Sequence, residues 1–315
     1  MTAAQAVLDY ITLKQSLGSR FHAETTILKA FCHALGDVAL VDVQPDQVAR
    51  YLAGSGPVTR FWHRKYEALS GFYRFALSRG YVTCSPLPTT VPKRPPPFQP
   101  YIYSRKQLRD LLRASAVYET TSRTSLEAVT LRTLVLLLYG AGLRIGEALA
   151  LTWADIDLDT ALLTIRESKF YKTRLVPIGP QLTAALRGYA ADRCQRGHAN
   201  IADAPFFVTR AGSAMTRTQA ERAFVRLRQI AGITREDGAR YQPRLHDLRH
   251  SMAVHRLIAW YREGADVQRL LPLLATYLGH VNVAATQRYL TMTPELLREA
   301  SQRFERYARS EVDHA

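Results

Sequence analysis

Cysteine, long apolar runs and acidic residues are all scarce in this sequence. Its three cysteines, Cys32, Cys84 and Cys194, lie far apart without pairing or metal-site spacing, which argues against a disulfide framework and indicates a reducing compartment. The longest apolar run, LVLLLYGAGL, is well short of the roughly 20 residues that span a bilayer. The N-terminus has no signal-peptide pattern. We therefore expect a cytoplasmic protein without a membrane partner.

The shortage of acidic residues leaves a large positive charge. There are 27 Asp and Glu residues against 42 Lys and Arg, which gives a formal charge of +15 and a pI near 10.0. Such a surplus favours polyanions and predicts salt-dependent binding. An anionic membrane surface is the alternative interpretation of the charge, but nucleic acid is favoured.

Proline is concentrated in one place and divides the chain. The stretch 85–100, SPLPTTVPKRPPPFQP, contains seven prolines, which exclude regular helix and stiffen a linker. Residues 1–84 show helical spacing of apolar residues and predict an all-α domain. Residues 101–315 form the second predicted domain.

The last predicted helix of the first domain carries both apolar and basic residues. Four of its apolar residues are expected in the core: Phe61, Leu69, Phe72 and Phe75. Four of its basic residues are candidate phosphate contacts: Arg60, Arg64, Lys65 and Arg74. A merely solvated face is an equally good interpretation of these charges.

The second domain is predicted to be mainly helical with a small antiparallel β-sheet. The segments ALLTIRES and TRLVPIG are rich in β-formers and flank KFYK, which predicts a hairpin whose connection presents Lys169 or Lys172. Lys172 is also a candidate DNA contact, and a later helix adds two more, Arg217 and Arg222. A last helix over 294–309 has an apolar face formed by Leu296, Ala300, Phe304 and Tyr307, and the simplest interpretation is that this face packs on its own domain.

The string GLRIGEAL surrounds Arg144 and follows one other glycine, Gly140. The glycine spacing is not that of a dinucleotide-binding turn, and no P-loop pattern occurs anywhere in the chain. We interpret the glycines as ending one helix and starting another, so that Arg144 is held in a fixed turn with support from Glu147. No cofactor is expected.

Three further strings contain residues suited to phosphate chemistry. LHDLRHS contains His246 and Arg249, three apart on one helical face, and YLGH ends at His280 before Tyr289 in TQRYL. His250 would complete a two-histidine metal pair, but the H-E-x-x-H pattern and a third ligand are missing, so no metal is expected. Arginines can clamp a phosphate, histidines can move protons and a tyrosine can be a nucleophile.

In this order, the residues resemble the signature of the tyrosine recombinase (phage integrase-like) family. The residues that match its catalytic set are Arg144, Lys169, His246, Arg249, His280 and Tyr289. Lys172 is an alternative to Lys169, which we prefer on its spacing from TRLVPI. The resemblance covers the second domain as the catalytic domain, and the helical residues 1–84 look like the family's core-binding (SAM-like) domain.

The resemblance implies a site-specific recombinase that needs neither metal nor cofactor. Tyr289 would attack a phosphate of double-stranded DNA and form a 3′-phosphotyrosine, while the lysine protonates the leaving 5′ oxygen. Integration, excision or transposition of mobile DNA would follow, within a homotetramer whose C-terminal helices are exchanged between protomers. Without DNA, the protein would be a monomer in solution. The alternative is a type IB topoisomerase-like enzyme that cleaves and reseals one strand without synapsis.

Overall fold

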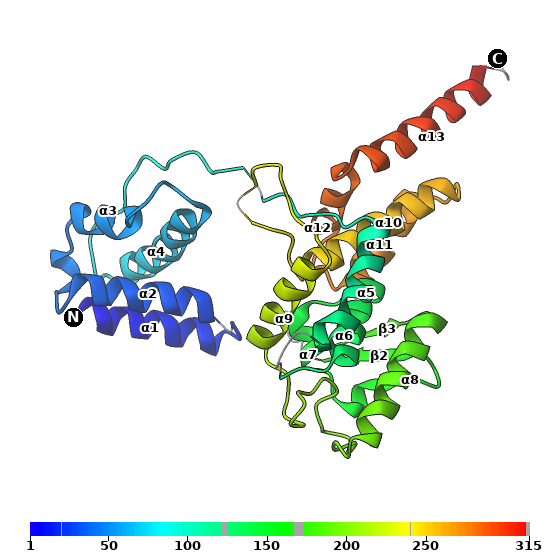
Figure 1. The fold of residues 1–315 in the computed structure, drawn as a ribbon. Helices are drawn as coiled ribbons and strands as arrows, with labels where there is room; N and C mark the ends of the chain where they lie inside the picture. The colour runs from blue at the N-terminus through cyan, green and yellow to red at the C-terminus, as the bar shows by residue number, and fades with distance from the viewer. Residues whose placement is uncertain (20, 97, 121–124, 167–172, 240, 313–315) are drawn as a thin grey trace. The chain divides into compact units, whose positions relative to one another are not determined.

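The computed structural model describes residues 1–19, 21–96, 98–120, 125–166, 173–239 and 241–312. The chain divides into two compact units, Met1–Phe98 and Gln99–Ala315, which we describe separately (Figure 1). The boundary falls inside the predicted proline-rich linker.

Every named helix or strand in the described residues of the first unit is a helix, as the sequence predicted. Its helices are α1 (Ala3–Ser16), α2 (His22–Leu35), α3 (Pro45–Ala53) and α4 (Arg60–Ser78), with a 3-10 helix η1 (Leu40–Asp42). Side-chain caps explain where α1 and α4 begin. The Thr2 hydroxyl accepts a hydrogen bond from the backbone N–H of Gln5, and the Thr59 hydroxyl accepts one from the backbone N–H of Phe61.

The core of this unit corrects one expectation. Leu69 and Phe72 are fully buried and Phe75 packs against them half-buried, but Phe61 is 52% exposed. Phe61 lies in the first turn of α4, where Trp62 and His63 occupy the buried side instead. Helical spacing alone did not distinguish Phe61 from its buried neighbour.

The second unit is a helical assembly around a small sheet. Its α-helices are α5 (Arg105–Thr120), α6 (Ala128–Gly140), α7 (Ile145–Leu149), α8 (Pro180–Gln195), α9 (Arg217–Ile230), α10 (Asp247–Arg262), α11 (Val267–Leu278), α12 (Ala284–Gln287) and α13 (Pro294–Val312). Two 3-10 helices are η2 (Trp153–Asp155) and η3 (Arg288–Thr291). The mainly helical fold predicted from the sequence is confirmed.

The predicted hairpin is present within a three-stranded antiparallel sheet. The strands are β1 (Ile156–Asp157), β2 (Leu162–Ile165) and β3 (Arg174–Pro177), in that spatial order. In the β2–β3 pair, Leu163 lies opposite Val176, and both side chains are buried. Lys169 and Lys172 fall in the β2–β3 connection, but they lie outside the described residues.

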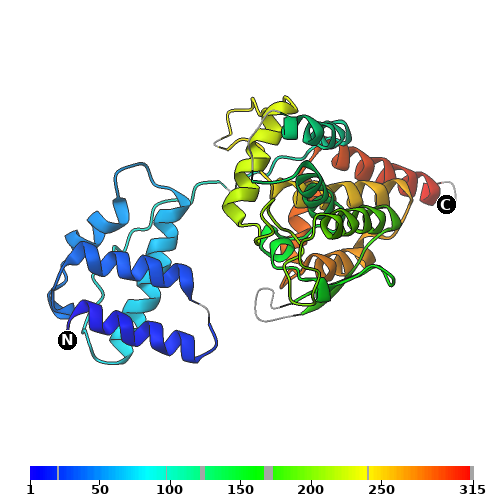
Figure 2. The same ribbon diagram turned by 60° about the horizontal axis from the view of Figure 1, so that its bottom comes forward.

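Two apolar clusters hold the elements that carry the predicted catalytic residues. A large cluster joins α5, α6, α8, α9 and the sheet. A second joins α10, α11, η3 and the start of α13, through residues such as Leu257, Leu274 and Leu296. The far end of α13 extends to the edge of the unit in both views (Figures 1 and 2).

Candidate active site

Arg144 lies in the turn between α6 and α7, as the glycine pattern predicted. It occupies the N-cap position of α7, with an extended backbone. Its guanidinium donates to Glu147 Oε1 at 2.5 Å and to the Gly279 carbonyl, at the end of α11, at 2.8 Å. The side chain is 31% exposed, so part of the guanidinium faces solvent and can meet a ligand.

Glu147 is the carboxylate that fixes this turn. It accepts from the Arg144 backbone at 2.9 Å and from both terminal nitrogens of Arg174, at 3.1 and 2.8 Å. Burial raises its pKa, but the hydrogen bonds from Arg174 and Arg144 outweigh this and lower the pKa to about 2. Arg174, the first residue of β3, was not among the predicted site residues, although it begins the RLVPI string.

Arg249 lies in the first turn of α10 and is almost completely buried. It donates to the carbonyls of Gly142 and Leu278, the latter at 2.5 Å. Burial, followed by the charge of Arg144, lowers its pKa to about 10, so it remains a cation. Arg144 and Arg249 thus bind the carbonyls of consecutive residues, Gly279 and Leu278, and the two guanidiniums converge at the end of α11.

His246 immediately precedes α10 at its N-cap position rather than lying within the helix. The side chain is exposed at the surface, although the protein atoms around its ring and then the charge of Arg249 lower its pKa to about 4. Its ring lies 4.8 Å, edge to face, from that of His250. His246 is therefore the histidine of this string that solvent and ligands can reach.

Tyr289 lies in η3 and is only 1% exposed. Burial raises its pKa, whereas the charges of Arg249 and Arg288 act to lower it. Its hydroxyl oxygen lies 3.1 Å from His250 Nδ1. The ring is stacked on His280, with the ring centroids 6.1 Å apart.

His280 follows α11 and is held by a neighbour. Its Nδ1 lies 2.6 Å from the Thr286 hydroxyl. Burial, followed by the charges of Arg249 and Arg144, lowers its pKa to about 4. The five predicted catalytic residues outside the hairpin connection are therefore gathered in one region: Arg144, His246, Arg249, His280 and Tyr289.

The predicted DNA contacts of the first unit differ in how exposed their side chains are. Arg64 is exposed, and Arg60 is exposed with hydrogen bonds to the Pro95 and Pro96 carbonyls. Lys65 instead donates to the Tyr51 carbonyl at 2.6 Å and lies over the Tyr51 ring, and burial lowers its pKa. These contacts favour a structural role for Lys65.

On α9, both predicted contacts are exposed. Arg217 pairs with Glu221 at 2.7 Å, and Arg222 follows one turn further along the helix. Neither belongs to the gathered cluster.

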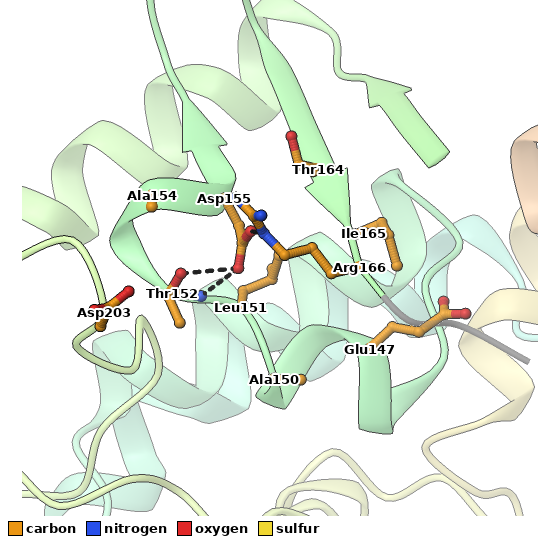
Figure 3. A pocket seen from close by; sticks show the side chains of 10 residues that line it. All are labelled: Glu147, Ala150, Leu151, Thr152, Ala154, Asp155, Thr164, Ile165, Arg166 and Asp203. Carbon is orange, nitrogen blue, oxygen red and sulfur yellow. Dashed lines mark hydrogen bonds and ion pairs between the residues drawn. The ribbon is translucent and has the colours of Figure 1, made fainter. Parts of the chain in front are cut away.

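A polar pocket of about 310 Å³ lies beside the site, between α7, η2 and the end of β2 (Figure 3). Asp155 is buried there and accepts from the Thr152 backbone at 3.0 Å and from its hydroxyl at 2.8 Å. Arg166, which follows β2, donates to the same carboxylate. Asp155 and Glu147 therefore each hold an arginine that borders the β2–β3 connection.

Two kinds of feature are missing from the described part of the chain. It contains no group of three or more His, Cys, Asp or Glu residues arranged to hold a metal ion. None of its helices is both long and apolar enough to cross a membrane.

Comparison with known proteins agrees with this geometry. The profile of the Phage integrase family matches residues 104–295. A relative named "Putative integrase/recombinase y4rB", from Sinorhizobium fredii, is 36% identical over 97% of this chain and 98% of its own length. Tyrosine recombinase XerC of Xanthomonas campestris is 26% identical over 92% of this chain and 84% of its own.

Solved structures share the fold. The Tn1549 transposon integrase in complex with a circular intermediate DNA matches with a TM-score of 0.68 and 16% identity, over 96% of this chain and 99% of that one. A lambda integrase tetramer bound to a Holliday junction matches with a TM-score of 0.65 and 18% identity, over 90% and 78%. With the family profile and the full-length relative, these findings show that the chain belongs to the phage integrase family and is a tyrosine-type site-specific DNA recombinase.

Proposed function

We propose that Tyr289 cleaves DNA by attacking a phosphodiester, forming a 3′-phosphotyrosine and releasing a 5′-hydroxyl. The observation that carries the proposal is the convergence of Arg144 and Arg249 on the region of Tyr289. Two guanidiniums can stabilise the charge that develops on the non-bridging oxygens of the phosphate. The energy of the broken bond is kept in the phosphotyrosine, so rejoining requires no nucleotide.

The other residues of the predicted catalytic set are assigned to proton transfer and phosphate binding. We assign proton transfer at the site to His246 and a hydrogen bond to the phosphate to His280. Lys169 is assigned as the general acid that protonates the leaving 5′ oxygen, with Lys172 as the alternative. Both lysines lie in the connection between β2 and β3, which Arg166 and Arg174 border.

The test is a covalent-complex assay on a nicked suicide substrate of double-stranded DNA. Wild type should trap a protein–DNA adduct, and Tyr289→Phe should trap none, because phenylalanine has no nucleophilic oxygen. Tyr139→Phe is the matched control, since Tyr139 also has its hydroxyl next to a histidine on α10, at 2.9 Å from His255 Nδ1. An adduct formed by Tyr289→Phe would overturn the choice of nucleophile.

Recombination requires strand exchange between two duplexes. We propose that the helical unit is a core-binding domain, that the second unit is the catalytic domain, and that both grip one duplex of double-stranded DNA. Products joined from two labelled duplexes would support integration, excision or transposition. Relaxation of supercoiled DNA without such products would support the topoisomerase-like alternative.

Assembly and location complete the proposal. We infer a homotetramer on DNA in which α13 of one protomer docks onto the next, in the cytoplasm. Support comes from the exposed apolar residues of α13: Leu297 is 50% exposed and Phe304 is 71% exposed. Cell fractionation tests the location.

A further inference from the structure

A fully buried threonine hydroxyl lies against the ring of His280. Thr286, in α12, is 0% exposed, and its Oγ1 lies 2.6 Å from His280 Nδ1. This is hydrogen-bonding distance. Thr286 therefore contacts one ring nitrogen of the residue that is assigned above to phosphate binding, and the other ring nitrogen, Nε2, is left for the phosphate.

The end of α11 brings this ring next to the arginines. Gly279 ends the helix in the left-handed conformation, with φ +65, and its carbonyl accepts a hydrogen bond from Arg144 at 2.8 Å. His280 is the next residue, and its backbone N–H donates to the Ala275 carbonyl at 2.9 Å. We therefore expect a phosphate bound by Arg144 to lie within reach of the His280 ring.

His280 can donate a hydrogen bond to that phosphate only if its proton is on the correct nitrogen. Burial, followed by the charges of Arg249 and Arg144, lowers the pKa of His280 to about 4, so the ring is neutral near pH 7 in the free protein. A neutral imidazole has one N–H donor and one acceptor nitrogen. It donates through Nε2 only when Nδ1 carries no proton, so the partner of Nδ1 decides whether His280 can bind a phosphate oxygen.

We propose that Thr286 is a positioning residue for His280, an inference that rests on the function proposed above. The Thr286 hydroxyl donates to His280 Nδ1, which keeps the ring proton on Nε2 and fixes the orientation of the ring. The Nε2–H group then donates to a non-bridging oxygen of the phosphate. Thr286 takes no part in proton transfer, which stays with His246 and the lysine of the β2–β3 connection.

The surroundings of Thr286 favour donation from its hydroxyl. If Nδ1–H donated to the hydroxyl instead, the hydroxyl proton would need a second acceptor. Among the hydrogen bonds of the described residues, the Thr286 hydroxyl has no partner besides His280, and a buried donor left unpaired is costly. Nε2 of His280 has no hydrogen bond to any described residue, so it is available to a ligand.

Backbone hydrogen bonds hold Thr286 in place independently of its hydroxyl. Its N–H donates to the Val283 carbonyl at 2.8 Å, and the N–H of Ala285 donates to the Asn282 side chain at 3.0 Å. Removal of the hydroxyl alone should therefore leave α12 folded. Valine has the same branched shape as threonine and makes this change.

The experiment measures single-turnover cleavage of the suicide substrate. Thr286→Val should cleave about tenfold more slowly, the effect of one hydrogen bond lost from the transition state. Thr286→Ser should cleave within about twofold of wild type, because serine keeps the hydroxyl. The matched control is Thr183→Val in α8, where Thr183 is 6% exposed and its hydroxyl donates to the Gly179 carbonyl at 3.1 Å. Thr183 does not belong to the gathered cluster, and this variant should cleave at the wild-type rate.

A double-mutant cycle separates an effect through His280 from an effect on the fold. In a His280→Ala background there is no ring to orient, so the addition of Thr286→Val should change the cleavage rate by less than about twofold. An equal tenfold loss in that background would make Thr286 a purely structural residue and overturn the proposal.

NMR of ¹⁵N-labelled histidine gives a measurement that does not depend on catalysis. The His280→Ala spectrum identifies the His280 ring among the nine histidines. In wild type the ring proton should lie on Nε2, and in Thr286→Val part of the population should carry it on Nδ1. A wild-type ring with its proton on Nδ1 would overturn the proposal, and this result is decisive even if Thr286→Val does not fold.

The two proposals fail separately. Adduct formation by Tyr289→Phe would remove the nucleophile and, with it, the proposed function. A Tyr289-dependent adduct that forms at the wild-type rate in Thr286→Val would leave the function standing and overturn only the role of Thr286.

Discussion

At the scale of single residues, the site depends on one buried carboxylate. Glu147 holds Arg144 in its turn and Arg174 at the start of β3, and its side chain is only 8% exposed. A buried charge of this kind is stable only while its partners remain, and the loss of one partner leaves the others uncompensated. Glu147 therefore links the turn that carries Arg144 to the first residue of β3.

We predict that Glu147→Gln lowers the free energy of unfolding at pH 7 by about 3 kcal/mol, as expected for a pKa of about 2 against 4.5. Because the folded-state pKa is depressed, this stabilisation is present above pH 4.5 and is lost as pH falls towards 2. Urea unfolding of both proteins at pH 7 and pH 3 measures it. The control is Glu295→Gln, which removes an exposed ion pair with Arg262 and should lower the free energy of unfolding by less than about 1 kcal/mol. If the difference in unfolding free energy between wild type and Glu147→Gln were the same at pH 3 as at pH 7, the pKa of Glu147 would not be linked to stability.

At the scale of elements, the turn between α6 and α7 and the end of α11 form one unit. Gly142 has φ +60, and a Cβ there would lie 2.8 Å from Met252 Cε and 2.9 Å from Leu278 Cδ2. Its carbonyl accepts from Arg249. A side chain here would therefore force Met252 and Leu278 to shift and would strain the left-handed backbone.

We expect Gly142→Ala to destabilise the protein by about 2 kcal/mol, through backbone strain and overpacking, and to slow cleavage as both arginines are displaced. Gly146→Ala is the matched control, because Gly146 lies within α7 with open space around it, and alanine there should be neutral or stabilising by up to about 1 kcal/mol. Thermal unfolding and single-turnover cleavage measure the two effects. Equal melting temperatures for the two variants would argue against the close approach of Met252 and Leu278 to the Gly142 backbone.

At the scale of the whole molecule, the described part of α13 carries exposed apolar side chains. Leu296 is fully buried against α10 and α11, whereas Leu297 and Phe304, seven residues apart, form an exposed stripe along another face. The predicted apolar face thus divides: Leu296 packs on its own unit, and Phe304 remains available. Tyr307, expected on the same face, has a side chain outside the described residues.

We predict that Phe304→Ser leaves the unfolding free energy within about 0.5 kcal/mol of wild type, because the side chain is already exposed. It should weaken cooperative assembly on paired sites, measured by native gel shift and analytical ultracentrifugation with DNA. Glu305→Gln, next in sequence and also exposed, is the control and should assemble normally. Normal tetramers of Phe304→Ser would contradict docking in trans.

Much of the fold follows from local patterns. The all-helical character of the first unit, the mainly helical character of the second, the hairpin of 162–177 and the turn at Arg144 were predicted because helical spacing, β-rich runs and glycine positions are local properties. Phe61 was predicted wrongly because one turn of helix offers two adjacent aromatics and only packing selects the buried one. His250 and Arg174 were missed as site residues because their significance depends on contacts with Tyr289 and Glu147, far away in sequence.

The sequence by itself determined the chemical parts of this recombinase: the basic charge, the two helix-rich segments about a proline-rich stretch, and the order of arginines, histidines and tyrosine. These are properties of residue type and short spacing, so they can be read without coordinates. Only the tertiary structure decided that Arg144 and Arg249 donate hydrogen bonds to the carbonyls of the neighbouring residues Gly279 and Leu278. It also decided that the Tyr289 hydroxyl lies against His250. Distances between these segments, which lie from 29 to 135 residues apart in the chain, are set by the packing of α6, α10 and α11, which no local pattern encodes.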